Sequence, residues 1–200
     1  MKQPFTPLPA GYFHALYSAN ADPWNLANSD YERRKCQATL DALPARRYHH
    51  AFEIGCAIGV LTRMLAARVD HLLSVDMEDI ALDQARVNCE GVANVRFERM
   101  VVPAAWPDRR FDLILLSEVL YYFSPDDIQH TAKKTRQSAS EDAVVVLVHW
   151  THPTDLPLSG DDATELFLTS VGPDLSPICQ IRTGDYRIDV LSSVARPDRR

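Results

Sequence analysis

Side chains suited to chemistry follow the apolar runs of this sequence, and the first of them lie in a glycine-containing segment. Gly55 and Gly59 are four residues apart, and Glu53 precedes Gly55 by two positions. Gly55 allows a tight turn and a close approach of the backbone to a ligand, and Gly59 lets the start of a helix pack tightly on a sheet. A dinucleotide site would show G-x-G-x-x-G instead. Glu53 would repel a pyrophosphate and attract an ammonium group. The competing interpretation is that both glycines only form a turn.

A single acid, Asp76, ends the next apolar run, LLSV, and lies 21 residues after Gly55. An acid about 20 residues beyond a glycine turn, at the end of the second strand, commonly accepts hydrogen bonds from ribose hydroxyls. The alternative is an acid in a solvated loop. The position directly after a buried run favours the ribose interpretation.

Two further apolar runs are followed by residues that suit a binding pocket. Met100 and Val101 come after the run at 95–97, and such apolar side chains can flank an adenine ring. Ser117 and Glu118 come directly after FDLILL, so we expect the Glu118 carboxylate at the mouth of a pocket. There it can orient the reacting group of a substrate and accept a proton from that group.

Two histidines, His149 and His152, flank Trp150 after the apolar run at 144–148. Histidines at the end of a strand suit a site that binds an acceptor and moves a proton. The alternative is that one histidine is buried and hydrogen-bonded and the other is exposed. The acids and histidines do not have the spacing of metal ligands, so no metal site is expected.

A doubly wound α/β sheet would bring these positions together, because ligands of such sheets bind beyond the carboxyl ends of the strands. Short apolar runs alternate with helical segments, which indicates a mostly parallel sheet, and a final hairpin adds an antiparallel end. We predict strands at residues 51–54, 72–75, 95–97, 111–116, 144–148, 178–181 and 186–194. We predict helices after Ser29, at residues 59–68 and 79–89, after Ser124 and after Ser159.

One domain is expected for the 200 residues, with an N-terminal arm and capping helix over 1–44 and a cofactor-binding sheet over 49–194. The net charge of −6 argues against a nucleic-acid partner or a basic membrane-binding protein. The four cysteines form no CxxC pair, which is typical of a protein in a reducing cytoplasm. No apolar run has the length of a signal peptide core or a membrane span.

Together these motifs resemble the class I S-adenosylmethionine-dependent methyltransferases, through Glu53-x-Gly55-x-x-x-Gly59, Asp76 and FDLILLSEVLYYF. The sequence is more specifically similar to the nodulation-protein-S type, which are N-methyltransferases that act on the amine of a chitooligosaccharide. That similarity extends from about residue 12 to residue 194, and it rests on DPW at 22–24, Tyr31-Glu32, GCAIGVLTRMLA, SEVLYYF and PLSGD at 157–161. Ala57 and Met100 depart from the class, which usually has glycine and aspartate at these positions.

The resemblance implies a seven-stranded Rossmann-like sheet, S-adenosylmethionine as the cofactor and a small-molecule acceptor. Glu53 and the Gly55 carbonyl would face the amino-acid part, Asp76 would hold the ribose, and Met77 and Val101 would flank the adenine. Trp24, Tyr31 and the N-terminal arm would close over the pocket as a lid. The full candidate set for the cofactor is Trp24, Tyr31, Glu53, Gly55, Cys56, Ala57, Gly59, Asp76, Met77, Met100, Val101 and Ser117.

The expected reaction is N-methylation of an amino sugar or oligosaccharide amine, with Glu118, His149 and His152 as the candidates that take the acceptor proton. Three alternatives stay open at this point. They are an O-methyltransferase on another metabolite, an NAD-dependent oxidoreductase on the same kind of sheet, and a binding protein that has kept the fold without catalysis.

Overall fold

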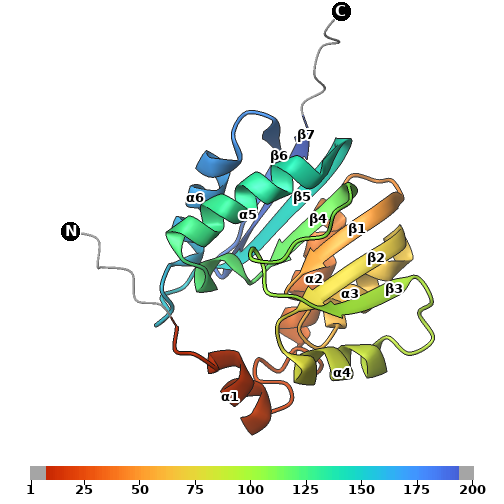
Figure 1. The fold of residues 1–200 in the computed structure, drawn as a ribbon, viewed down its shortest axis with the longest axis vertical. Helices are drawn as coiled ribbons and strands as arrows, with labels where there is room; N and C mark the ends of the chain where they lie inside the picture. Colours follow the sequence, from red (N-terminus) through yellow and green to blue (C-terminus); the bar gives the residue numbers. More distant parts are fainter. Residues whose placement is uncertain (1–7, 194–200) are drawn as a thin grey trace, which may run out of the picture.

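A seven-stranded sheet forms the centre of the computed structural model, which describes residues 8–193 (Figure 1). The ends of the predicted domain, including Val194 of the last predicted strand, lie outside the described residues. The strands are β1 (Tyr48–Ile54), β2 (Val69–Asp76), β3 (Val95–Arg99), β4 (Phe111–Ser117), β5 (Ala139–Trp150), β6 (Leu175–Arg182) and β7 (Tyr186–Ser193). The α-helices are α1 (Tyr12–Ala19), α2 (Asp30–Ala42), α3 (Val60–Leu65), α4 (Asp79–Asn88), α5 (Pro125–Ser138) and α6 (Gly160–Val171). Two short 3₁₀ helices are η1 (Ala66–Arg68) and η2 (Leu120–Tyr122).

The strand order is β3-β2-β1-β4-β5-β7-β6, and the first five of these strands are parallel. β7 is antiparallel to both β5 and β6. This confirms the predicted doubly wound sheet with an antiparallel C-terminal strand. The direction of winding reverses between β1 and β4, so the carboxyl ends of these two strands border the crevice in which such sheets bind ligands.

Alternate residues of β4 supply the two halves of the core, as the two-residue period of a strand requires. Leu113 and Leu115 belong to the cluster that packs against α2 and α3. Ile114 and Leu116 belong to the cluster that packs against α5 and α6. FDLILL is therefore apolar throughout because helices cover both faces of this central strand.

Serine caps begin three of the helices as the sequence predicts. Ser29, Ser124 and Ser159 each accept a hydrogen bond from the backbone N–H three residues later. The S-x-x-E pattern of Ser29 and Glu32 is typical of a capping box, but only the serine half forms, because the carboxylate of Glu32 accepts from Lys35 instead. The helix predicted to reach Arg68 ends at Leu65 and continues as η1.

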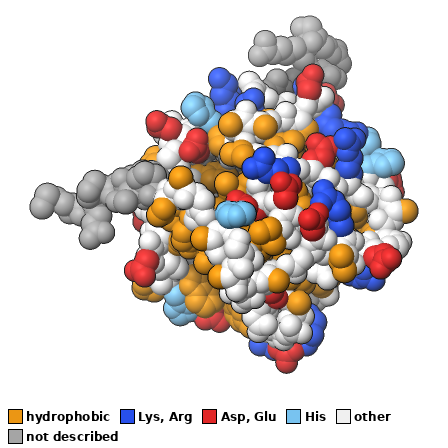
Figure 2. All heavy atoms as spheres, turned by 60° about the horizontal axis from the view of Figure 1, so that its bottom comes forward, with side chains coloured by type: hydrophobic (Ala, Val, Ile, Leu, Met, Phe, Trp, Pro, Cys, Tyr) orange, Lys and Arg blue, Asp and Glu red, His pale blue; other side chains and the backbone are white. Residues whose placement is uncertain are grey.

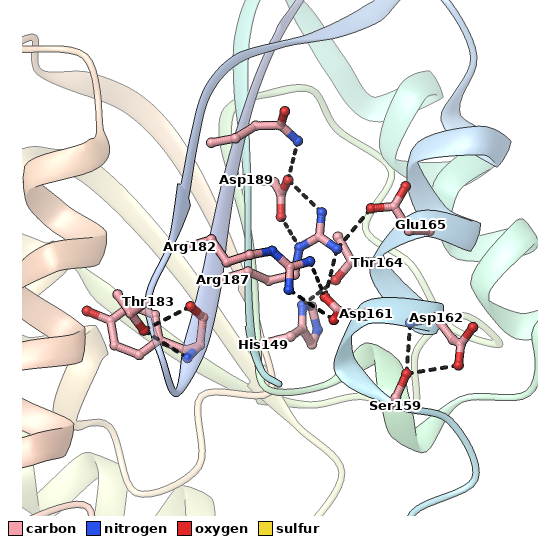
Figure 3. A network of polar contacts seen from close by, with 12 residues as sticks. His149, Ser159, Asp161, Asp162, Thr164, Glu165, Arg182, Thr183, Arg187 and Asp189 are labelled. Carbon is pink, nitrogen blue, oxygen red and sulfur yellow. Dashed lines mark hydrogen bonds and ion pairs between the residues drawn. The ribbon is translucent and has the colours of Figure 1, made fainter. Parts of the chain in front are cut away.

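Buried charges hold the C-terminal hairpin against α6 (Figure 3). The Arg187 guanidinium is almost fully buried in β7 and donates to Asp189 on its own strand and to Asp161 on α6. Glu165 forms a further ion pair with Arg187 at 2.9 Å. A buried charge is tolerated when it is paired and hydrogen-bonded in this way. The network keeps the start of α6 close to the end of β5.

Among residues 8–193, no helix has the length and apolar character needed to cross a bilayer.

Candidate active site

A cavity of about 690 Å³ opens at the carboxyl ends of β1, β2 and β4. Figure 2 turns the end of the molecule that carries α1 toward the viewer, and hydrophobic side chains gather on that face. Most of the predicted site residues line this one cavity: Trp24, Glu53, Gly55, Cys56, Ala57, Asp76, Met77, Met100, Val101, Ser117 and Glu118. The fold thus gathers side chains that lie almost 100 positions apart in the sequence.

Glu53, near the end of β1, presents a buried carboxylate to the cavity. Its Oε2 atom accepts hydrogen bonds from the hydroxyls of Thr62, at 2.6 Å, and Ser74, at 2.7 Å. Burial raises the pKa of Glu53 above its ordinary value, although both hydroxyls lower it. A cation that entered the cavity would therefore find a fixed and poorly solvated negative charge.

The turn after β1 needs Gly55 because of the protein's own packing. Gly55 has a φ of 76°, and a Cβ atom there would lie 2.2 Å from Cγ1 of Val119. Ala57 also has a positive φ, 48°, at the position where the broad class has glycine. An alanine in this left-handed region is strained. This conformation directs the backbone N–H of Ala57 toward Asp76, where it donates a hydrogen bond to the Oδ2 atom at 3.0 Å.

The carboxylate of Asp76, the last residue of β2, is fixed by hydrogen bonds from the backbone, so Asp76 is not an acid in a solvated loop. Its two oxygens accept from the backbone N–H groups of Ala57 and Glu78, each at 3.0 Å. Burial nevertheless raises the pKa of Asp76. A carboxylate offers about four lone-pair sites. Asp76 therefore keeps capacity to accept a further hydrogen bond from a hydroxyl in the cavity.

Large apolar side chains are left partly exposed along this cavity. Trp24, Met77 and Val101 are 38%, 37% and 45% exposed, and all three line it. The N-terminal arm covers the same region: Tyr17 of α1 is buried against Trp24, with ring centroids 5.6 Å apart, and Phe13 packs edge-on against Tyr122. Apolar walls of this kind suit a flat aromatic ring. Movement of the arm as a lid stays a prediction.

Glu118 follows β4 and lies in the cavity wall with every oxygen engaged. Its carboxylate accepts from Lys35 at 2.7 Å, from the hydroxyl of Tyr121 at 2.5 Å and from the backbone N–H of Trp150 at 3.0 Å. Burial alone would raise the pKa of Glu118, but the Lys35 ammonium and the hydrogen bonds hold it below its ordinary value. Glu118 is thus a firmly held anion with low proton affinity.

The sequence matches the profile of the family described as nodulation protein S (NodS) over residues 16–147, which is more than half of the chain. The chain belongs to the NodS family.

Relatives of this family share part of the sequence. Nodulation protein S of Rhizobium tropici is 33% identical over 102 residues, which cover 50% of this chain and 43% of that protein. Nodulation protein S of Azorhizobium caulinodans is 34% identical over 104 residues, which cover 50% of this chain and 49% of that protein. The chain spans about half the length of the curated relatives that it matches.

Solved structures share the fold. A chain from Pseudomonas syringae is 31% identical, with a TM-score of 0.71 over 81% of this chain and 98% of that one. The N-methyltransferase NodS from Bradyrhizobium japonicum WM9, solved in complex with S-adenosyl-L-homocysteine, is 20% identical, with a TM-score of 0.76 over 90% of this chain and 97% of that one.

Both histidines proposed from the sequence lie outside the cavity lining of this NodS-family chain, which corrects their assignment. His149 is fully buried: its Nε2 atom accepts from the backbone N–H of Leu120, so its Nδ1–H donates to the Thr164 hydroxyl. Burial lowers the pKa of His149 to about 4, so it is neutral. His152 is exposed and paired with Asp185 at 2.8 Å. One buried and one exposed histidine is the alternative left open by the sequence.

Tyr31 and Gly59 are also placed differently from the expectation, because neither lines the cavity. The ring of Tyr31 packs edge-on against Trp150, with centroids 5.9 Å apart, and burial raises the pKa of Tyr31 to about 12. A Cβ atom on Gly59 would lie 3.0 Å from Ala85 of α4. Gly59 therefore allows two helices to approach each other, and the close neighbour is α4 and not the sheet.

Lys35 is a charged residue of the cavity lining that sequence reasoning missed. It is 6% exposed, lines the cavity and pairs with both Glu32 and Glu118. Burial would lower the pKa of Lys35, but these two carboxylates raise it, so the ammonium stays charged. One signal was available: Lys35 lies on the face of α2 that also carries Cys36, Thr39 and Leu40, all of them buried.

Within residues 8–193, no group of three or more histidine, cysteine, aspartate or glutamate side chains is arranged to hold a metal ion.

Proposed function

We propose that this chain is an S-adenosylmethionine-dependent methyltransferase that acts on a small-molecule amine. The observation that carries the proposal is the pair of carboxylates, Glu53 and Asp76, which neighbouring parallel strands present to one cavity in a chain of the NodS family. The B. japonicum NodS, which was solved with S-adenosyl-L-homocysteine and has the same fold, supports this choice of cofactor.

The residues of the cavity fit this cofactor. The Oε2 atom of Glu53 is occupied by two hydroxyls, which leaves Oε1 for the ammonium group of the methionine part. Asp76 lines the cavity and keeps acceptor capacity for the ribose hydroxyls. Met77 and Val101 offer apolar contact to the adenine. When bound, the cofactor would supply a methyl group that its sulfonium has already activated. The protein would then align and desolvate the acceptor, whose amine must give up its proton to solvent or to a carboxylate of the cavity before its lone pair can attack.

For the acceptor we propose the amine of an amino sugar or of a longer oligosaccharide. The printed description of the B. japonicum protein as an N-methyltransferase supports nitrogen over oxygen. The acidic side chains Glu32 and Glu118 in the cavity wall also support it, because they attract a basic nitrogen. The aromatic rings of the N-terminal arm cover the cavity and would keep water from the reacting pair.

Calorimetry and a transfer assay test the proposal. We expect one binding site per chain for S-adenosylmethionine and for S-adenosylhomocysteine, and no binding of NAD. With methyl-labelled S-adenosylmethionine and glucosamine, we expect label on the sugar nitrogen, identified by mass spectrometry. N-acetylglucosamine is the matched control, because its nitrogen is an amide without a basic lone pair. Binding of NAD in place of both adenosyl ligands would overturn the proposal.

A further inference from the structure

A carboxylate, an ammonium group and a second carboxylate form a row in the cavity wall. The Nζ atom of Lys35 lies 2.7 Å from Oε1 of Glu118 and 3.0 Å from Oε2 of Glu32. All three side chains line the cavity that also contains Glu53 and Asp76. The row joins α2 to the end of β4, so one wall of the cavity depends on a contact between residues 83 positions apart.

The two carboxylates of this row differ in how many hydrogen bonds they already accept. Glu118 accepts from three donors, and its backbone has a φ of 57°, which is costly for a residue other than glycine. Such a residue is fixed in place and has little capacity for a new partner. Glu118 is thus the anchor of the row.

Glu32 has the free capacity that Glu118 lacks. Within the described residues, the hydrogen bonds to its carboxylate come from Lys35 alone, while a carboxylate has about four acceptor sites. Its side chain is 15% exposed and lines the cavity. Glu32 also lies in the first turn of α2, where Ser29 caps the helix and fixes the backbone. The carboxylate is therefore held in place and still open to a ligand.

The charge of the cavity favours a cation. Among the described residues that line the cavity, Lys35 carries the single ammonium, and six carboxylates oppose it: those of Glu32, Glu53, Asp76, Glu78, Glu118 and Asp127. The excess negative charge repels carboxylate or phosphate groups, and the attraction for a cation is stronger in a partly buried site than in water.

We propose that Glu32 binds the nitrogen of the methyl acceptor, with Lys35 as the residue that positions the Glu32 carboxylate. This proposal rests on the function proposed above. Glu32 attracts the charged amine on arrival and accepts a hydrogen bond from its N–H, which sets the orientation of the nitrogen in the cavity. It thereby selects amines over neutral hydroxyl compounds. Glu118 keeps the wall in place and makes no contact with the nitrogen.

The experiment compares Glu32→Gln with Asp30→Asn, which removes the same charge from the same helix turn at an exposed side chain outside the cavity lining. Glucosamine is the probe, and N-acetylglucosamine is the neutral reference. We expect Glu32→Gln to weaken glucosamine binding by about tenfold or more. The affinity for S-adenosylhomocysteine should stay as in the wild type, and the urea midpoint should fall only modestly, because Lys35 keeps its ion pair with Glu118. Asp30→Asn should change none of these quantities, and Glu32→Asp should recover part of the glucosamine affinity.

Three outcomes of this experiment would overturn the proposal. Unchanged glucosamine binding in Glu32→Gln, or wild-type binding of glucosamine no tighter than that of N-acetylglucosamine, would overturn the proposal for Glu32. Equal losses for both sugars would also overturn it, because they would indicate a change of shape and not of charge. These outcomes leave S-adenosylhomocysteine binding intact, so they are distinct from a failure of the proposed methyltransferase function, in which that ligand would not bind.

Discussion

Replacing Lys35 with methionine should destabilise the protein strongly, because it leaves the Glu118 carboxylate without its cation. Methionine keeps the length and volume of the side chain but removes the ammonium that lies 2.7 Å from Glu118. Removal of one partner from a buried ion pair costs about 3–5 kcal/mol. We expect ~3 kcal/mol, at the lower end, because Tyr121 and the Trp150 N–H still donate to Glu118. For a chain of this size that corresponds to a fall in Tm of about 6–12 °C.

The pH dependence separates this explanation from a simple packing defect. In the wild type the pKa of Glu118 is lowered, so its contribution to stability is present above the pKa of the unfolded chain and is lost as the pH falls. In Lys35→Met, burial is no longer opposed by the ammonium, and the pKa of Glu118 should rise. The variant should then lose stability as the pH rises through that higher pKa. The difference from the wild type should therefore be larger at pH 8 than at pH 5.

Urea denaturation at both pH values measures these differences. Lys134→Met, at an exposed position of α5, is the matched control and should stay close to the wild type. The double variant Lys35→Met, Glu118→Gln should recover most of the lost stability, because it buries no unpaired charge. A loss in Lys35→Met that is the same at pH 5 and pH 8, with no recovery in the double variant, would refute the electrostatic reasoning.

Three further predictions concern the cofactor side of the cavity. Asp76→Asn should weaken S-adenosylhomocysteine binding by about tenfold or more, since it removes the charge that accepts from ribose hydroxyls; calorimetry measures this, and an unchanged affinity would assign Asp76 only to the turn. Ala57→Gly should stabilise the protein by ~0.5–1 kcal/mol in urea denaturation, because glycine adopts a φ of 48° without strain; a destabilised variant would contradict this. The affinity for S-adenosylhomocysteine should fall from pH 7 to pH 5, because burial raises the pKa of Glu53 and of Asp76 and a protonated carboxyl loses its attraction for the ligand. Glu53→Gln should remove much of that pH dependence, and an affinity that is flat in the wild type would argue against a raised pKa at either residue.

Local sequence patterns were enough to predict most of the elements and the place of Glu53 and Asp76 at the ends of neighbouring strands. The continuous apolar run FDLILL predicts a strand covered on both faces, and β4 is such a strand. Ser124-Pro125 predicts a helix start, and α5 begins at Pro125. Glu53 and Asp76 were found because each stands at a strand end, and parallel strands place their carboxyl ends side by side. These features depend on periods of two or 3.6 residues and on short-range capping, which the sequence alone contains.

Tertiary packing decided which side chains form the proposed acceptor side of the cavity. Lys35 reaches Glu118 because α2 packs against the sheet and so brings residues 83 positions apart into contact. His149 is buried and neutral, although the sequence shows it next to a residue of the cavity wall, because the helix that starts at Gly160 covers it. Whether a polar side chain at a strand end faces a ligand or a neighbouring helix depends on which element lies above it. That choice is made by long-range packing, and no local period in the sequence encodes it.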